Sequence, residues 1–280
     1  MTGEAGARTR AGLMRDLWGL GLRPGDVVMV HASLRAVGSV EGGPDAVVGA
    51  LLDAIAPQGT LLAYVSWDRS PYEETLNSRT LTVQERDAWP AFDPATAGTY
   101  PGFGALNAFI VRHPDARRSD HPDASMAAIG PLAEGLVAGH APGNAFGPGS
   151  PLDRFVAVGG RVLLLGAPLD AVTVLHYAEA VAAVPGKRRV TYAMPVLDAD
   201  GRKVWVRAED YDSNGILDQY AVPGQPDAVE TVMRAYVAER PHRSGRVGDA
   251  PCRLFEAPDL VRFAVDRLER WHGTPGAGAG

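Results

Sequence analysis

The stretch "DVVMVHASL", residues 26–34, places four consecutive apolar residues directly before a short polar turn. A Val-rich run of this kind predicts a strand that is buried on both faces. Residues 42–57, "GGPDAVVGALLDAIAP", predict a helix, because a proline stands near the start and apolar residues follow at helical spacing. Residues 59–67, "GTLLAYVSW", predict a second strand. A strand, a helix and a strand in this order usually build a parallel sheet, so the stretch predicts an α/β fold.

The remaining chain extends this pattern on both sides. Apolar runs and helical spacing predict helices over residues 8–20, 105–113, 168–184 and 257–271, and a buried strand over residues 160–167. Two β-rich runs flank Asp200-Gly201 and predict a hairpin within an excursion over residues 186–222. Residues 68–100 are polar with little periodicity, so a long loop is expected there. We expect one three-layer α/β/α domain over residues 1–272, with a central mixed, largely parallel sheet, and a flexible tail over residues 273–280.

The composition and charge of the 280-residue chain restrict its function. Hydrophobic residues make up 46% and charged residues 21%, as in ordinary soluble proteins. The chain has no apolar run of about 18 residues and no apolar segment in its first twenty, so we expect a cytoplasmic protein without a membrane span or signal peptide. The net charge of −6 argues against a nucleic-acid partner, because binding of phosphates requires a basic surface.

Most familiar functional motifs are absent from the sequence. It has no P-loop, zinc-protease or nucleophile-elbow motif, and the G-x-G at residues 102–104 lacks a third glycine. The single Cys252 excludes an internal disulfide and a cysteine-based metal cluster. The histidines are scattered without the spacing of paired ligands, so no metal site is expected.

His176 and Glu179 stand out in the stretch "VLHYAEA", residues 174–180, which is otherwise apolar apart from Tyr177. Residues three apart share one face of a helix, so the carboxylate of Glu179 can orient the imidazole of His176. Imidazole changes its charge near neutral pH, which suits such a pair to accept a proton from a nucleophile. A buried histidine paired with a carboxylate for structural reasons is an equally good interpretation of the spacing.

The turn at residues 31–35 follows the first predicted strand at its carboxyl end, where α/β folds bind ligands. Its small residues, Ala32 and Ser33, allow the backbone to approach an anion, and amides at a helix start favour phosphate. From the residues alone, an ordinary turn between strand and helix is the favoured interpretation.

Residues 119–130, "SDHPDASMAAIG", form the third polar candidate. The pattern predicts a turn that leads into a helix or a strand. A hydrolase pair of Ser125 and His121 is conceivable, but neither residue stands at a nucleophile elbow.

Six blocks taken together resemble the aminoglycoside 3-N-acetyltransferases, an acetyl-CoA-dependent group distinct from the GCN5-related acetyltransferases. They are "VHASLRAVG", "GTLLAYVSWDRSPYEET", "SDHPDASMAAIGP", "FGPGSPLDRF", "GRVLLLGAPLDAVTVLHYAE" and "GRVGDAPCRLFEAPDLVRFAV". The blocks follow the order of the family from about residue 10 to residue 270. Each block is weak alone, but six in order are specific.

The resemblance implies transfer of acetyl from acetyl-CoA to the 3-amino group of a 2-deoxystreptamine aminoglycoside, with antibiotic resistance as the result. The general base of the family falls on His176 and its acidic partner on Glu179. The amine attacks the thioester directly, so no protein nucleophile is needed. In "GAPLDAVTVLH", residues 166–176, Asp170 and Thr173 are kept, while Ala171 and Val172 replace the Ser-Asn pair of many members.

The resemblance also implies how the two substrates are held. Residues assigned to acetyl-CoA are the turn His31, Ala32, Ser33, Leu34 and Arg35, whose amides hold the pyrophosphate, and His121 and Ser125 near the pantetheine arm. An aminoglycoside carries several ammonium groups, so carboxylates are expected to line its cleft. Residues assigned to the aminoglycoside are Tyr64, Asp68, Glu73, Asp170, Glu209, Asp210 and Asp212. Asp68 is the first choice among these acids, each of which is more often a solvated surface charge.

Two other functions fit the same sequence. One is an acetyltransferase of this fold that acts on a different amine, and the other is a protein that binds aminoglycosides without catalysis. The intact His176 and Glu179 pair argues against the second. The expected partners are a small-molecule aminoglycoside and no nucleic acid or membrane, in a monomer or a homodimer.

Overall fold

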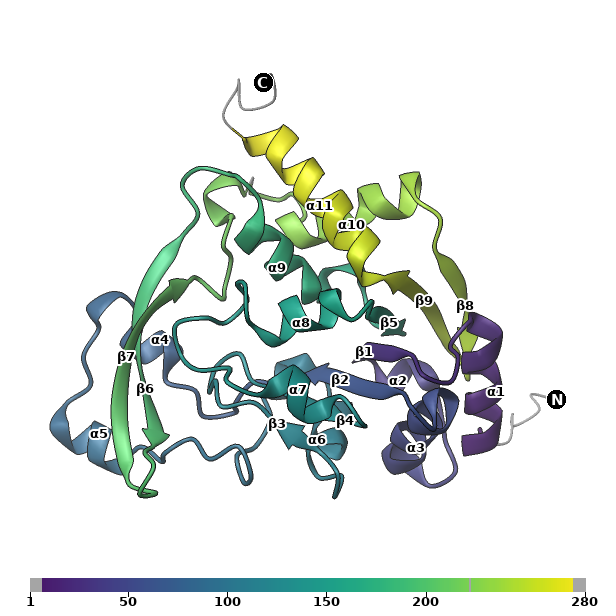
Figure 1. The fold of residues 1–280 in the computed structure, drawn as a ribbon, viewed down its shortest axis with the longest axis horizontal. Coiled ribbons are helices and arrows are strands. Elements are labelled where there is room, and N and C mark those ends of the chain that lie inside the picture. Colours follow the sequence, from purple (N-terminus) through teal and green to yellow (C-terminus); the bar gives the residue numbers. More distant parts are fainter. Residues whose placement is uncertain (1–6, 222, 274–280) are drawn as a thin grey trace.

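A seven-stranded mixed sheet runs through the centre of the computed structural model, which describes residues 7–221 and 223–273 (Figure 1). The strands stand in the order β3-β4-β2-β1-β5-β9-β8. Their bounds are β1 Val27–Ala32, β2 Thr60–Tyr64, β3 Arg117–Arg118, β4 Met126–Ile129, β5 Arg161–Leu165, β8 Arg243–Val247 and β9 Ala250–Glu256. Parallel pairing joins β1 to β2 and to β5, and the outer strands pair antiparallel. The predicted mixed α/β sheet is confirmed, with its parallel part at the centre.

Alternate residues of β1 face two different hydrophobic layers. Val28 and Val30 pack into one cluster with the helices α1 and α3, whereas Met29 packs into the other with α8 to α11. Since successive side chains of a strand point to opposite faces, an all-apolar strand needs helices on both sides. The helices of the first layer are α1 Arg10–Leu20, α2 Leu34–Val37, α3 Gly43–Ile55 and α6 Leu106–Val111. Those of the second are α7 Ala133–Val137, α8 Pro151–Ala157, α9 Val174–Val181, α10 Ala228–Glu239 and α11 Ala257–His272.

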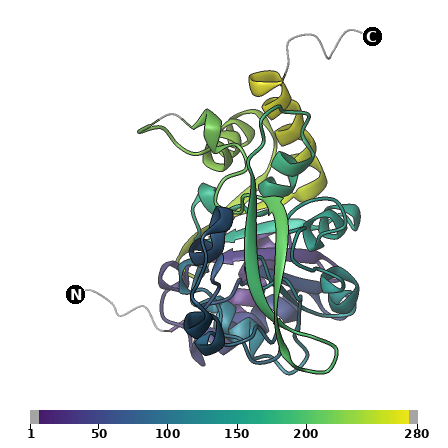
Figure 2. The same cartoon turned by 90° about the vertical axis from the view of Figure 1, so that its left-hand side faces the viewer.

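The hairpin predicted around Asp200-Gly201 is present as a separate two-stranded sheet. Its strands are β6 Arg189–Leu197 and β7 Lys203–Tyr211. Figures 1 and 2 show this long ribbon standing across one end of the central sheet. Tyr192 and Met194 of β6 pack against Tyr72, which fixes the hairpin to the segment after β2.

The segment over residues 68–100 differs from the expected loop, because it contains short helices. They are α4 Tyr72–Thr75, the 3₁₀ turn η1 Leu76–Ser78 and α5 Val83–Ala88, and η2 Pro101–Phe103 follows. A capping box starts α5: Thr82 accepts from the Glu85 amide, and the Glu85 carboxylate accepts from the Thr82 amide. Further 3₁₀ turns are η3 Leu169–Ala171 and η4 Asp218–Tyr220. The expected tail lies outside the described residues from residue 274 onward.

The helices of the described chain are either too short or too polar to cross a membrane.

Candidate active site

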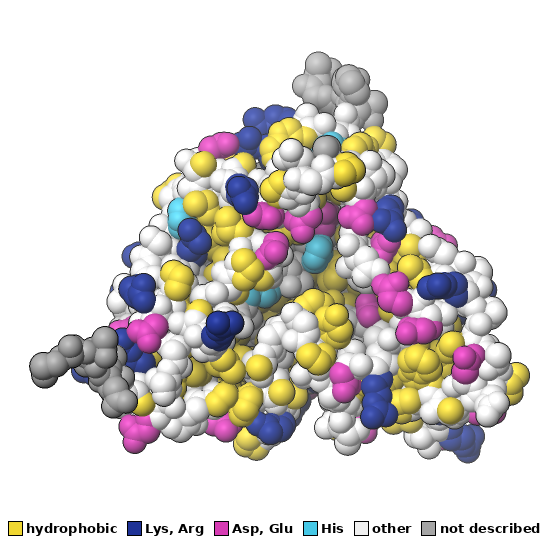
Figure 3. All heavy atoms as spheres, turned by 180° about the vertical axis from the view of Figure 1, so that it is seen from behind, with side chains coloured by type: hydrophobic (Ala, Val, Ile, Leu, Met, Phe, Trp, Pro, Cys, Tyr) yellow, Lys and Arg dark blue, Asp and Glu magenta, His cyan; other side chains and the backbone are white. Residues whose placement is uncertain are grey.

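The three parallel strands end on one edge of the sheet, and their ends meet at a cleft of about 460 Å³. His31 stands at the end of β1 and Tyr64 at the end of β2, while Ala167 follows β5. This is where open α/β sheets bind ligands. The other residues that line the cleft are Ala32, Ser33, Gly102, Phe103, Gly104, Pro168, Asp170, Ala171, Thr173, His176 and Ser213. Figure 3 shows a hollowed face on the back of the molecule, where Asp and Glu side chains gather beside histidine.

His176 and Glu179 form a hydrogen-bonded pair at this cleft. Helix α9 places them three residues apart, and His176 Nδ1 lies 2.7 Å from Glu179 Oε2. The Glu179 side chain is 5% exposed and that of His176 is 25% exposed, so the carboxylate is enclosed while the imidazole reaches the cleft. The carboxylate keeps the proton on Nδ1, which leaves Nε2 as the nitrogen available to a substrate.

Phe146 holds the His176 ring from one face. The two rings stack with centroids 4.9 Å apart and an interplanar angle of 28°. Phe146 is fully buried, and the amide of its neighbour Ala145 donates to the carboxylate of Asp210 at 2.8 Å. Phe146 opens the block "FGPGSPLDRF", but a stacking partner from another segment leaves no local signal in the sequence.

The turn after β1 has amides available to an anion, although fewer than expected. The Ser33 amide donates to Leu165 O at 2.9 Å, so it is already engaged. Leu34 and Arg35 open α2, and the first amides of a helix have no partner within it. Gly104 crosses the end of β1 with φ +96°, and a Cβ there would lie 2.9 Å from Ala32 O. The close approach of these two backbones therefore requires glycine.

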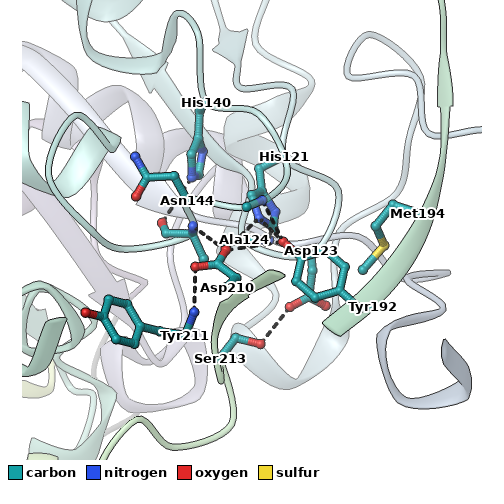
Figure 4. Close-up of polar contacts among 12 residues, drawn as sticks. His121, Asp123, Ala124, His140, Asn144, Tyr192, Met194, Asp210, Tyr211 and Ser213 are labelled. Atoms are coloured by element: carbon teal, nitrogen blue, oxygen red, sulfur yellow. Dashed lines mark hydrogen bonds and ion pairs between the residues drawn. The ribbon is translucent and has the colours of Figure 1, made fainter. Parts of the chain in front are cut away.

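His121 and Ser125 differ from the expected position near the pantetheine arm, because both are buried and neither lines the cleft. His121 Nε2 lies 3.1 Å from the hydroxyl of Tyr192, and its Nδ1 accepts from the Ala124 amide at 2.9 Å (Figure 4). Ser125 Oγ accepts from Arg118 at 3.1 Å. Their polar atoms are used to join chain segments inside the protein.

Asp210 and Asp212 also differ from the expectation of cleft carboxylates. They are 2% and 0% exposed, and neither lines the cleft. Asp210 accepts from the Ala145 amide and from the Tyr192 hydroxyl, which lies 3.2 Å away (Figure 4). Asp212 accepts from the Tyr72 hydroxyl at 3.1 Å and pairs with Arg188 at 2.7 Å. Both acids fasten the end of β7 to the rest of the molecule.

Of the other residues assigned to the aminoglycoside, the cleft contains Tyr64 and Asp170. Asp170 is exposed at the mouth of the cleft. Tyr64 is buried, and burial raises the pKa of its hydroxyl well above 10. The exposed Asp68 lies outside the cleft lining, as do Glu73, which accepts from Asn214, and Glu209, which pairs with Arg189 at 2.8 Å. In place of Asp68, Asp170 is the acid that the structure brings to the cleft.

Ser213, Ser70 and Asp123 form a polar group at the site that no sequence pattern indicated. Ser213 lines the cleft and donates to Asp123 at 2.9 Å, and Ser70 donates to the same carboxylate at 2.7 Å. Burial is the main cause that raises the pKa of Asp123. No cluster of three metal-ligating side chains occurs in the part of the chain that the structure describes.

Known proteins match both the sequence and the fold. The family model of the aminoglycoside 3-N-acetyltransferases matches residues 29–269. Aminoglycoside N(3)-acetyltransferase III of Serratia marcescens is 64% identical over 260 residues, which cover 93% of this chain and 97% of that protein. The structure of AAC-VIa bound to sisomicin has a TM-score of 0.92 at 53% identity and covers 96% of this chain and 100% of that chain. The structure of AAC-IIIb with CoASH has a TM-score of 0.89 at 36% identity and covers 97% and 100%. The chain therefore belongs to the aminoglycoside 3-N-acetyltransferase family of acyltransferases.

Proposed function

We propose that the chain transfers the acetyl group of acetyl-CoA to the 3-amino group of a 2-deoxystreptamine aminoglycoside and thereby confers resistance. The observation that carries this proposal is the His176–Glu179 pair at a cleft beside the ends of the parallel strands. The similar AAC-IIIb and AAC-VIa are solved with CoASH and with sisomicin, which supports the same donor and the same class of acceptor for this chain.

In the proposed reaction, His176 is the general base. Its Nε2 takes a proton from the 3-amino group as the amine nitrogen attacks the thioester carbonyl carbon, and Glu179 stabilises the imidazolium that forms. The C–N bond forms, the C–S bond breaks, and the CoA thiolate receives the proton from His176. The amine attacks directly, so no acyl-enzyme intermediate arises. Holding amine and thioester side by side supplies a large share of the acceleration.

The turn after β1 holds the acetyl-CoA pyrophosphate in this proposal, through the amides of Leu34 and Arg35. Leu34→Pro removes one of these donors. Proline is well tolerated at the first position of a helix, and Ser33 before it is extended, with φ −105° and ψ 99°, and so avoids the helical conformation that a following proline disfavours. We expect the KM for acetyl-CoA to rise roughly tenfold or more, the size of one hydrogen bond to a charged group, with little change for the aminoglycoside.

Leu34→Ala is the matched control, because it shortens the same side chain and keeps the amide. Its KM for acetyl-CoA should stay near wild type. Equal increases in both variants would assign the effect to packing and contradict the phosphate contact. Ser33→Pro is a poorer test, since it also removes the hydrogen bond from Ser33 to Leu165.

Asp170 binds an ammonium group of the aminoglycoside in this proposal. It is exposed at the mouth of the cleft, so Asp170→Asn should raise the aminoglycoside KM roughly two- to fivefold, as for a solvated ion pair. The change in kcat should be smaller, because an interaction of this kind is made in the ground state and the transition state alike. High salt should reduce the difference from wild type. Asp68→Asn is the control outside the cleft, and a larger increase in this variant would contradict the assignment.

An assay of thiol release tests the proposed function. Purified protein and acetyl-CoA are mixed with aminoglycosides of the 4,5- and 4,6-disubstituted classes, and free CoA is measured over time. The proposal predicts release that depends on an aminoglycoside. Binding of the drug without release would indicate a sequestering protein, and release with other amines alone would indicate a different acetyltransferase.

A further inference from the structure

His31 has an unusual environment at the end of β1. The residue is half-buried and lines the cleft together with His176. Its Nε2 is enclosed by protein and has no hydrogen-bond partner among the residues that the structure describes. Buried polar atoms in proteins are nearly always paired, so an unpaired nitrogen in a cleft calls for a functional explanation. The amides of the neighbouring turn, which bind phosphate in the proposed function, do not involve this ring.

The enclosed Nε2 determines which nitrogen carries the proton in the neutral ring. A buried N–H without an acceptor is rarer in proteins than a buried acceptor without a donor. The proton of His31 therefore belongs on Nδ1, and Nδ1 is the nitrogen left to the cleft because Nε2 is enclosed. In this tautomer the ring presents an N–H donor to a bound ligand.

Burial also keeps the ring neutral. It is the main cause that lowers the pKa of His31 to about 4, and the charge of His176 contributes in the same direction. His31 is consequently neutral near neutral pH. A neutral imidazole can polarise a carbonyl group by donating a hydrogen bond, as it does in triosephosphate isomerase. The cleft thus holds two imidazoles with different roles, one that accepts a proton and one that donates a hydrogen bond.

We propose that His31 is a second catalytic residue, whose Nδ1–H donates to the thioester carbonyl oxygen of acetyl-CoA and stabilises the oxyanion that forms there. The inference rests on the proposed acetyl transfer. As the amine attacks, the carbonyl π electrons move to the oxygen that faces His31. They return when the C–S bond breaks, and His31 keeps its proton throughout. His176 alone moves a proton, from the amine to the departing thiolate.

The tautomer can be tested without a reaction. In protein labelled with ¹⁵N at histidine, with the signals assigned through His31→Gln, the His31 shifts should identify a neutral ring protonated on Nδ1 between about pH 5.5 and 8.5. A proton on Nε2, or titration within this range, would overturn the proposal.

Kinetics and binding test the catalytic role. His31→Ala should lower kcat about 10²–10³-fold, the usual cost of losing one oxyanion donor. The Kd of CoA, which has no thioester carbonyl, should remain within twofold of wild type. His31→Gln retains an N–H donor and should recover part of the lost rate. The control is His113→Ala, a histidine away from the cleft, which should behave as wild type.

A loss of CoA affinity as large as the loss of kcat would overturn the proposal, because His31 would then act in binding. A kcat within twofold of wild type in folded His31→Ala would overturn it as well.

A third measurement separates this inference from the proposed function. A ketone analogue of acetyl-CoA with a ¹³C carbonyl needs neither aminoglycoside nor proton transfer. Its carbonyl signal should lie downfield when bound to wild type or to His176→Ala, and should lose this shift in His31→Ala. An unchanged shift in His31→Ala would contradict the role of His31 even if acetyl transfer is correct.

Discussion

His176→Ala is expected to lower kcat by about 10²–10⁴-fold, the usual contribution of a general base, while the Kd of the aminoglycoside changes little. The reason is the geometry of the pair: Glu179 engages Nδ1 at 2.7 Å, so Nε2 is free to accept the proton of the attacking amine. Without the ring, the amine has to lose its proton to water. Thiol release gives kcat, and calorimetry with the aminoglycoside gives the Kd.

Glu179→Gln is the matched variant for this prediction. It removes the negative charge that stabilises the imidazolium but retains an oxygen that can accept from Nδ1, so its loss of kcat should be smaller than that of His176→Ala. A folded His176→Ala protein with the wild-type kcat would show that another group is the base. A greater loss in Glu179→Gln than in His176→Ala would show that the carboxylate has a separate role.

Asp210→Ala is expected to lower the free energy of unfolding by about 3–5 kcal/mol, as found when one partner of a buried polar or ionic pair is removed. The Asp210 carboxylate is buried, accepts from the Ala145 amide and the Tyr192 hydroxyl, and lies 3.7 Å from His121 Nε2. Alanine would leave these groups without their common acceptor in a site that excludes water. Urea denaturation, with the same m-value for both proteins, measures the difference.

Glu209→Ala provides the comparison, because Glu209 precedes Asp210 on β7 but is exposed and pairs with Arg189 on the surface. An exposed pair contributes about 0.2–1 kcal/mol, so this variant should remain close to wild type. Equal stabilities of Asp210→Ala and Glu209→Ala would contradict the role assigned to the buried carboxylate. Since Asp210 also holds the amide next to Phe146, Asp210→Ala should in addition lower kcat through the His176 ring.

The parts of the fold that the sequence predicted are those with strong local patterns. The apolar runs of β1, β2 and β5 and the helical spacing of α3 are visible without tertiary information, because their buried residues are apolar and recur at the spacing of the element itself. The strand β8 was not predicted. Four of its five residues are exposed, so it has neither an apolar run nor the alternation of a half-buried strand.

The residues of the candidate site, too, could be predicted from the sequence only where they interact locally. His176 and Glu179 are three residues apart on one helix, so their pairing could be predicted from spacing. The contact between Asp210 and Ala145 joins residues 65 apart in the chain, and the stacking of Phe146 on His176 joins two segments that only the fold brings together. Asp210 and Asp212 were expected in the cleft because carboxylates suit a substrate with several ammonium groups, and the structure buries both against donors that the sequence does not identify.

The position of the acetyl group on the product tests the central claim most directly. Wild-type protein is incubated with sisomicin and acetyl-CoA labelled with ¹³C at the carbonyl, and the product is examined by NMR. The account predicts a single labelled amide whose carbonyl correlates with the proton on C3 of the deoxystreptamine ring. A label on any other nitrogen, or no labelled product while sisomicin binds, would contradict it.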